Sequence, residues 1–226
     1  MADAPDWPKV VSLAVHEFRT PLTVVSGYLR MLSTDRVGPM SDAQRRVIEE
    51  AERSCARLSS LLTELSDVAH FHQGRVSFLK SPVALARLLE AIRLPESPEA
   101  PPALRVGGGA GEVTITGDAS RLGAALTAVA SAIARETLDA PVHVLPELRD
   151  GAAGREAFLA FGSEPLAREI LAGPVTALPP FDATRGGSGL SLVVARQILE
   201  EHGARLYGAP GERPRAGAGI ALPLSS

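Results

Sequence analysis

Residues 15–22 of this 226-residue chain read VHEFRTPL and lie within the first long stretch of helical periodicity. Around them, apolar residues recur every three or four positions and form one stripe along a helix, which we expect to be buried against another helix. The stripe consists of Val11, Phe18, Leu22, Val25, Leu29 and Leu32. Since an apolar stripe of this length needs partner helices to cover it, this amphipathic helix decides the fold of the N-terminal part.

His16 lies off that stripe. With about 100° of rotation per residue, about 160° separate His16 from Phe18, whereas Thr20 lies close beside His16. We therefore expect the imidazole and the hydroxyl to share the solvent-exposed face, with Glu17 near enough to bond an imidazole N–H. An exposed helical histidine is usually only a solvated surface residue, but the acid and the hydroxyl beside this one favour phosphoryl transfer through the imidazole.

Breakers and capping signals predict a hairpin of two long helices. The first is expected to begin near Trp7 and to stop before Gly38, and the second to run from a capping box at Ser41 and Gln44 to about Phe71. The stripe of the second helix consists of Ile48, Cys55, Leu58, Leu62, Leu65 and Ala69. Two helices alone leave apolar surface uncovered, so we expect a homodimer in which a second copy completes a four-helix bundle.

After Gln73 and Gly74 the pattern changes to short alternating segments separated by glycine and proline. The predicted domains are therefore residues 1–74 and residues 75–226. In the second domain we expect strands near residues 76–79, 113–116, 142–145, 157–161, 205–207 and 220–222, and helices near residues 83–92, 120–136 and 190–201. The predicted fold class is α+β, a helical hairpin followed by a sandwich of helices on a sheet.

The composition narrows the class of protein. A net charge of −3 with scattered charges offers no basic field for nucleic acid, so no nucleic acid partner is expected. The single cysteine, Cys55, excludes an intrachain disulfide framework and is expected to be buried. No membrane segment and no export signal are recognised, and we expect the chain to be cytoplasmic.

The sequence HEFRTPL, residues 16–22, resembles the H-box of the sensor histidine kinases of two-component systems. The resemblance implies that His16 is phosphorylated on nitrogen, that Glu17 assists the transfer, and that Thr20 positions a water for dephosphorylation of a response regulator. It also implies that the hairpin is the dimerisation and histidine phosphotransfer domain, whose partners are the receiver domains of response regulators. Pro21, which lacks a backbone donor, is expected to kink the helix just past the site.

The second domain resembles the ATP-binding domain of the same kinases. Gly186, Gly187 and Gly189 precede a helix as in the second glycine box of the family, where backbone amides hold a phosphate. The resemblance is uneven, because Ala128 and Ala132 stand where the family has asparagines. The asparagine replaced at position 132 holds magnesium in the family, and a methyl group supplies no oxygen ligand for that cation.

The segment AFGSEP, residues 160–165, occupies the place of the family's Asp-x-Gly-x-Gly box, whose aspartate binds the adenine amino group. No aspartate is present, Glu164 would have to move considerably to replace it, and Phe161 in or near the base pocket suggests that protein fills the pocket. Loss of such a polar contact commonly costs about 1–3 kcal/mol. We therefore expect no metal ligands in the chain and regard ATP with magnesium as a doubtful cofactor.

Three interpretations remain. The first is a histidine phosphotransferase, a dimeric relay that exchanges a phosphoryl group between His16 and regulator aspartates without using ATP, with the second domain kept as a docking scaffold. The second is an ATP-dependent histidine kinase with unorthodox nucleotide contacts. The third is a response regulator phosphatase that uses Thr20. The intact H-box, combined with loss of both ligand positions, favours the relay.

Overall fold

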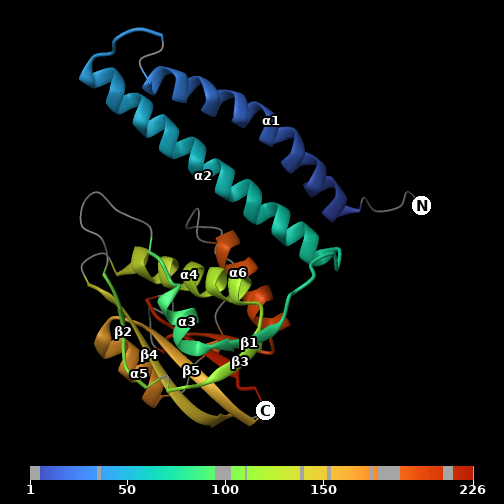
Figure 1. Ribbon diagram of the computed structural model, residues 1–226, viewed down its shortest axis with the longest axis vertical. Coiled ribbons are helices and arrows are strands. Elements are labelled where there is room, and N and C mark those ends of the chain that lie inside the picture. Colours follow the sequence, from blue (N-terminus) through green and yellow to red (C-terminus); the bar gives the residue numbers. More distant parts are fainter. Residues whose placement is uncertain are drawn as a thin grey trace. The chain divides into compact units, whose positions relative to one another are not determined.

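The computed structural model describes residues 6–34, 37–94, 103–109, 111–137, 140–151, 154–173, 176–177, 189–210 and 216–225. The chain divides into two compact units, Met1–Val76 and Ser77–Ser226. Figure 1 shows the elements of each unit, which are described separately here.

The first unit is a hairpin of two long helices, α1 (Trp7–Ser33) and α2 (Asp42–His72), which lie side by side in Figure 1. Two hydrogen bonds join opposite ends of the helices. The Gln73 side chain donates to Ser12 Oγ at 3.5 Å, and Ser33 Oγ donates to Glu52 Oε1 at 3.1 Å. The start of α1 therefore meets the end of α2, which confirms the predicted antiparallel hairpin.

The predicted capping box at the start of α2 is present. The Gln44 backbone N–H donates to Ser41 Oγ at 3.3 Å, and the Ser41 backbone N–H donates to Gln44 Oε1 at 2.9 Å. Each side chain thereby satisfies a backbone donor that the first turn of the helix leaves without a partner.

Burial on the hairpin differs from the predicted stripes. Among the described residues of α1 only Val15 is buried, at 3% exposure, whereas Phe18 and Val25 are 62% and 48% exposed. On α2 Cys55 is buried as expected, but Leu58 is 51% exposed. In the single chain Phe18, Val25 and Leu58 are exposed because one antiparallel neighbour covers only a narrow arc of each helix, and their burial by a second copy stays a prediction.

In its described residues the second unit holds a six-stranded sheet, a two-stranded sheet and four helices. The order in the large sheet is β2-β4-β5-β8-β7-β6, and β1 pairs with β3. The strands are β1 (Ser81–Ala84), β2 (Leu104–Val106), β3 (Thr114–Gly117), β4 (Val142–Gly151), β5 (Gly154–Gly162), β6 (Thr176–Ala177), β7 (Arg205–Gly208) and β8 (Ala218–Pro223). The helices are α3 (Leu85–Glu90), α4 (Ala119–Glu136), α5 (Glu164–Ala172) and α6 (Gly189–Glu201). This arrangement confirms the predicted α+β sandwich.

Helices cover both faces of the large sheet. Phe158 and Ala160 of β5 pack with Ala167 and Ile170 of α5 in one buried cluster. Because successive side chains of a strand point to opposite faces, Phe161 points to the other face. On that side α4 contacts β4 and β5, and α6 packs against α4, as Figure 1 shows.

Several predicted boundaries need correction. The strand expected at residues 76–79 is wrong, since this segment has no regular structure and the first strand, β1, begins at Ser81. The helix expected at residues 83–92 is only α3, which is shorter. The elements β2, α5 and β6 were not predicted; α5 opens with Glu164-Pro165, and a proline suits the first turn of a helix.

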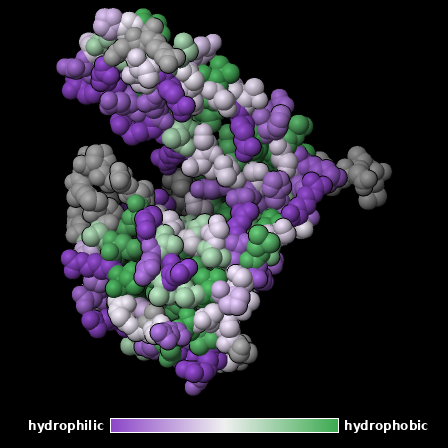
Figure 2. Space-filling view, viewed as in Figure 1, coloured by the Kyte–Doolittle hydropathy of each residue, from purple (hydrophilic) through white to green (hydrophobic). Residues whose placement is uncertain are grey.

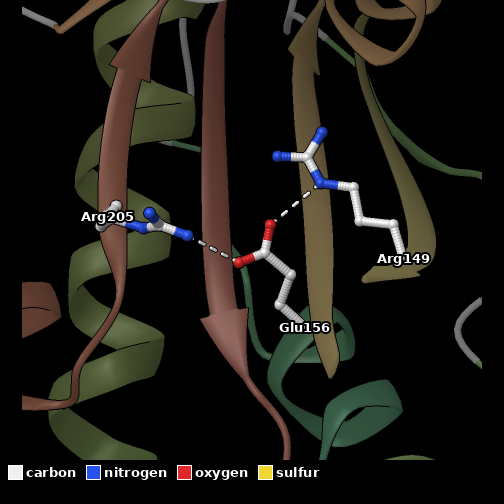
Figure 3. Close-up of polar contacts among 3 residues, drawn as sticks. All are labelled: Arg149, Glu156 and Arg205. Carbon is white, nitrogen blue, oxygen red and sulfur yellow. Dashed lines mark hydrogen bonds and ion pairs between the residues drawn. The ribbon is translucent and has the colours of Figure 1, made fainter. Parts of the chain in front are cut away.

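A buried carboxylate ties three strands of the large sheet together (Figure 3). Glu156 of β5 is 5% exposed and accepts hydrogen bonds from Arg149 Nε of β4 at 3.0 Å and from Arg205 Nη2 of β7 at 2.9 Å. The Arg149 guanidinium lies 3.5 Å from the centroid of the Phe158 ring. A Cβ at Gly151 would overlap the carboxylate, so the paired charges fill this part of the sheet face.

No helix in the described parts of the chain has both the length and the apolar character that crossing a bilayer requires.

Glu156→Gln should lower the free energy of unfolding of the second unit by about 1–3 kcal/mol, because two arginines then lose their buried anion. Urea unfolding followed by circular dichroism measures the change. Trp7, the only tryptophan, lies in α1, so its fluorescence follows the hairpin separately and should be unaffected. Glu147→Gln, which changes an exposed acid on the neighbouring strand β4, is the matched control. Equal unfolding midpoints for the two variants would contradict a stabilising role of Glu156.

Candidate functional site

The histidine singled out in the sequence lies in the third turn of α1 with its side chain in solvent. The His16 side chain is 79% exposed and the Glu17 side chain 73% exposed. His16 Nδ1 lies 3.7 Å from Glu17 Oε1, longer than a hydrogen bond but close enough for a small side-chain rotation to form one. The imidazole is therefore open to a partner molecule on one side and within reach of a carboxylate on the other.

Thr20 is exposed one helical turn beyond His16, as the helix geometry predicted. Pro21 lies inside α1, which continues to Ser33. Because proline has no backbone N–H, the carbonyl of Glu17 loses its usual helical partner next to the histidine. Two residues further on, Thr23 Oγ donates a side-chain hydrogen bond to the Arg19 carbonyl at 2.8 Å.

A groove runs along the hairpin beyond this site, between α1 and α2. It is lined by small and polar residues of both helices together with one arginine and one glutamate: Thr23, Ser26, Gly27, Arg30, Glu52, Cys55, Ala56 and Ser59. A Cβ added at Gly27 would meet no atom within 4 Å, so the backbone is open there. Small residues of this kind allow another helix to approach closely.

The glycine box of the second unit is only partly described. Gly189 is the first residue of α6, whereas Gly186 and Gly187 lie outside the described residues. The structure therefore leaves the predicted phosphate-binding role of these glycines untested.

The helix α4 carries the positions that hold magnesium in the family resemblance. Ala132 is 9% exposed and Ala128 is half-buried, and neither side chain has an oxygen atom. Nearby, Thr137 Oγ already donates to the carbonyl of Ile133 at 3.0 Å. Within the described parts of the chain, no group of three His, Cys, Asp or Glu side chains is arranged to hold a metal ion. Ala128 and Ala132 themselves supply no oxygen ligand for a magnesium ion.

The segment that replaces the adenine-binding box is built into the sheet and α5. Phe161 is fully buried in β5 opposite Val144 of β4. Glu164, the first residue of α5, binds the guanidinium of Arg168 at 2.8 Å, and this hydrogen bond lowers the pKa of the Glu164 carboxyl below its ordinary value. The acid that would have to replace the missing aspartate is therefore ionised and already paired.

Known proteins resemble the hairpin and, at lower identity, most of the chain. The family profile described as His Kinase A (phospho-acceptor) domain matches residues 9–74. The sensor protein VanS of Enterococcus faecium is 24% identical over 211 residues, which are 88% of this chain and 52% of that protein. The phosphate regulon sensor protein PhoR of Pseudomonas aeruginosa is 35% identical over 78 residues, which are 34% of this chain and 17% of that protein.

Among solved structures, full-length ShkA in complex with AMPPNP has the same fold, with a TM-score of 0.59 and 22% sequence identity. The match covers 97% of this chain and 46% of that chain. The chain thus spans about half the length of VanS and of ShkA.

The exposure of His16 predicts its chemical reactivity. Diethylpyrocarbonate should modify His16 at least about tenfold faster than His202, because the His202 ring is 7% exposed and both of its nitrogens are hydrogen-bonded. Mass spectrometry of the two tryptic peptides during the reaction measures the two rates. Similar rates at both rings would mean that the His16 imidazole is covered in solution.

Proposed function

We propose that this member of the sensor histidine kinase family, with a phospho-acceptor hairpin and the fold of a histidine kinase catalytic domain, is a two-component phosphorelay protein. It carries a phosphoryl group on His16 and exchanges it with the aspartates of response regulators. The observation that carries the proposal is the exposed imidazole on α1 beside the Glu17 carboxylate.

The transfer needs little from this chain beyond positioning. When Glu17 accepts the Nδ1–H of His16, the tautomer is fixed and Nε2 keeps its lone pair for attack. A receiver domain docked over α1 brings its phosphorylated aspartate in line with Nε2. The Nε2–P bond forms as the aspartyl O–P bond breaks, and the reverse step returns the phosphoryl group. Any metal at the aspartate is supplied by the receiver domain.

The partner of the hairpin in this proposal is a second copy of the chain. Large apolar side chains are exposed on both helices of the single hairpin: Trp7, Val10, Leu13, Phe18, Val24, Val25, Tyr28 and Met31 on α1, and Val47 and Leu58 on α2. Since exposed apolar residues in such number favour association, a four-helix bundle formed by two hairpins is the arrangement that covers them. Small residues such as Gly27 in the groove leave room for the second copy.

We further propose that the relay operates without autophosphorylation from ATP. Three observations support this: Ala132 has no ligand atom for magnesium, Phe161 is buried in the sheet, and Glu164 is paired with Arg168. The alternative is an ATP-dependent kinase with unorthodox contacts, and the AMPPNP complex of ShkA is the observation that favours it.

His16→Ala should abolish labelling of this protein by a phosphorylated receiver domain, because the acceptor nitrogen is removed, while the oligomeric state stays unchanged. Incubation with a radiolabelled receiver domain, followed by electrophoresis and size-exclusion chromatography, measures both. His72→Ala, which removes an exposed histidine of α2, is the matched control and should keep full labelling. Label that persists in the His16 variant would refute the assignment of the acceptor.

Thr20→Ala separates the relay from the phosphatase alternative. If the protein is a relay, the Thr20→Ala variant should accept the phosphoryl group on His16 at the wild-type rate, since the hydroxyl takes no part in the transfer. A phosphatase that orients water through Thr20 would lose dephosphorylation of the regulator in this variant. Slower transfer in the variant would place Thr20 in the relay step itself.

Titration with Mg-ATP tests the second part of the proposal. Neither calorimetric binding at millimolar nucleotide nor acid-labile phosphohistidine is expected in the wild-type chain, because the side chains around Ala132 and Phe161 do not fit the metal and the base. His16→Ala shows whether any label formed is on that histidine. Binding accompanied by labelling of His16 would establish the kinase alternative.

A further inference from the structure

The segment that connects the two units is fixed at both ends by backbone hydrogen bonds. On the hairpin side, Gln73 and Gly74 donate to the carbonyls of Ala69 and Phe71, and the Arg75 N–H donates to the His70 carbonyl at 3.1 Å. Gly74 has a φ of +62°, the left-handed conformation that commonly ends a helix. The connector therefore stays part of the α2 terminus as far as Arg75.

On the other side, Asp118 holds both the connector and the start of α4. Its Oδ1 accepts the Arg121 N–H at 3.1 Å as the helix cap, and its Oδ2 accepts the Leu79 N–H, also at 3.1 Å. The hydrogen bond from Arg121 is the main cause that lowers the pKa of the Asp118 carboxyl, so the group is ionised at neutral pH. One carboxylate thus joins residue 79 to α4.

His202, directly after α6, extends this contact to a second helix. Its Nε2 accepts the Asp118 backbone N–H at 2.9 Å, and its Nδ1 lies 2.6 Å from the Ile198 carbonyl. Because a carbonyl only accepts hydrogen bonds, Nδ1 carries the hydrogen and the ring is the neutral tautomer. The ring is 7% exposed, and Gly117 makes room for it, since a Cβ there would lie 2.9 Å from His202 Cδ2.

The connector residues on either side of Leu79 also bind the end of α6. The Phe78 ring meets the His202 ring edge-on with centroids 5.0 Å apart, and the Lys80 ammonium donates to the Glu201 carbonyl. Lys80 Nζ also lies 5.9 Å from the centroid of the Phe78 ring. Three consecutive connector residues are therefore attached to the ends of α4 and α6.

Only Val76 and Ser77 remain between these two attachments, and neither makes a backbone hydrogen bond to another described residue. We propose that Asp118 and His202 form a latch on the connector, so that Phe78–Lys80 moves with α4 and α6 and the joint between the two units is confined to Val76 and Ser77. A displacement of α4 or α6 is then transmitted to the end of α2 through only two residues of the chain. The latch is independent of the phosphorelay proposal, since it rests on contacts within the second unit and at the end of α2.

Asp118→Asn tests the latch because asparagine caps helices about as well as aspartate but presents an NH2 group where Oδ2 accepts the Leu79 N–H. In the full-length protein, amide hydrogen exchange measured by NMR should accelerate about tenfold at Leu79 and stay within about twofold at Arg121. Unchanged exchange at Leu79 would overturn the latch. Parallel acceleration at both amides would also overturn it, because the carboxylate would then act only as the cap of α4.

A second pair of variants tests His202. His202→Leu removes the acceptor of the Asp118 N–H and should accelerate exchange at Asp118 and Leu79, whereas His202→Gln keeps an acceptor oxygen and should preserve most of the protection. Loss of protection throughout α4 and α6 in both variants would show that the ring serves the core of the unit and would contradict the latch.

Distance measurements test the consequence for the joint. Spin labels at Arg46→Cys on α2 and Glu169→Cys on α5, in a Cys55→Ser background, report the separation of the two units. Labelled chains are diluted with unlabelled chains so that each oligomer carries one pair of labels. Asp118→Asn should broaden the distribution of distances, because the connector loses its hydrogen bond at Leu79 and is then held only by the contacts of Phe78 and Lys80 with the end of α6. An unchanged width would mean that the latch does not restrain the connector.

Discussion

An amphipathic helix has one buried face and one exposed face. The proposed function of this protein depends on which residues of α1 lie on each face. Neighbouring residues fall about 100° apart around the axis, so Val15 is 3% exposed against α2 while the side chain of His16 is 79% exposed. If the helix were rotated by one residue, the imidazole would lie in the buried position of Val15, where neither solvent nor a partner could reach it. The packing of α1 on α2 therefore fixes the accessibility of the proposed phosphoryl acceptor.

In the second unit, the packing has to cover both faces of a broad sheet. The cluster of Phe158 with α5 covers part of one face, and beyond it the carboxylate of Glu156 is paired with two arginines. On the other face α4 contacts β4 and β5, and several alanines of this helix, including Ala132, are buried. In our proposal, these small side chains leave a magnesium ion without the oxygen ligand that an asparagine would supply.

The two units differ in the reactive and ligand-binding side chains that they provide. The hairpin keeps the acid and the hydroxyl around its histidine, whereas in the second unit Ala132 has no oxygen atom and Glu164 is paired with Arg168. A relay fits this division, because phosphoryl transfer between a histidine and an aspartate demands accessibility and alignment more than a nucleotide site. The connector links this accessible site to a unit whose helices α4 and α6 hold it through Asp118 and His202.

The sequence by itself determined the long helices, the capping box at Ser41 and the exposed face of His16, because local periodicity and capping residues carry this information directly. It also determined the α+β class of the second unit, although it missed α5. Only the tertiary structure decided that Val15 rather than Phe18 is buried, and that Glu156 lies between Arg149 and Arg205. The same holds for His202, which contacts Asp118 from 84 residues away, since such pairings depend on how distant segments meet and leave no periodic signal in the chain.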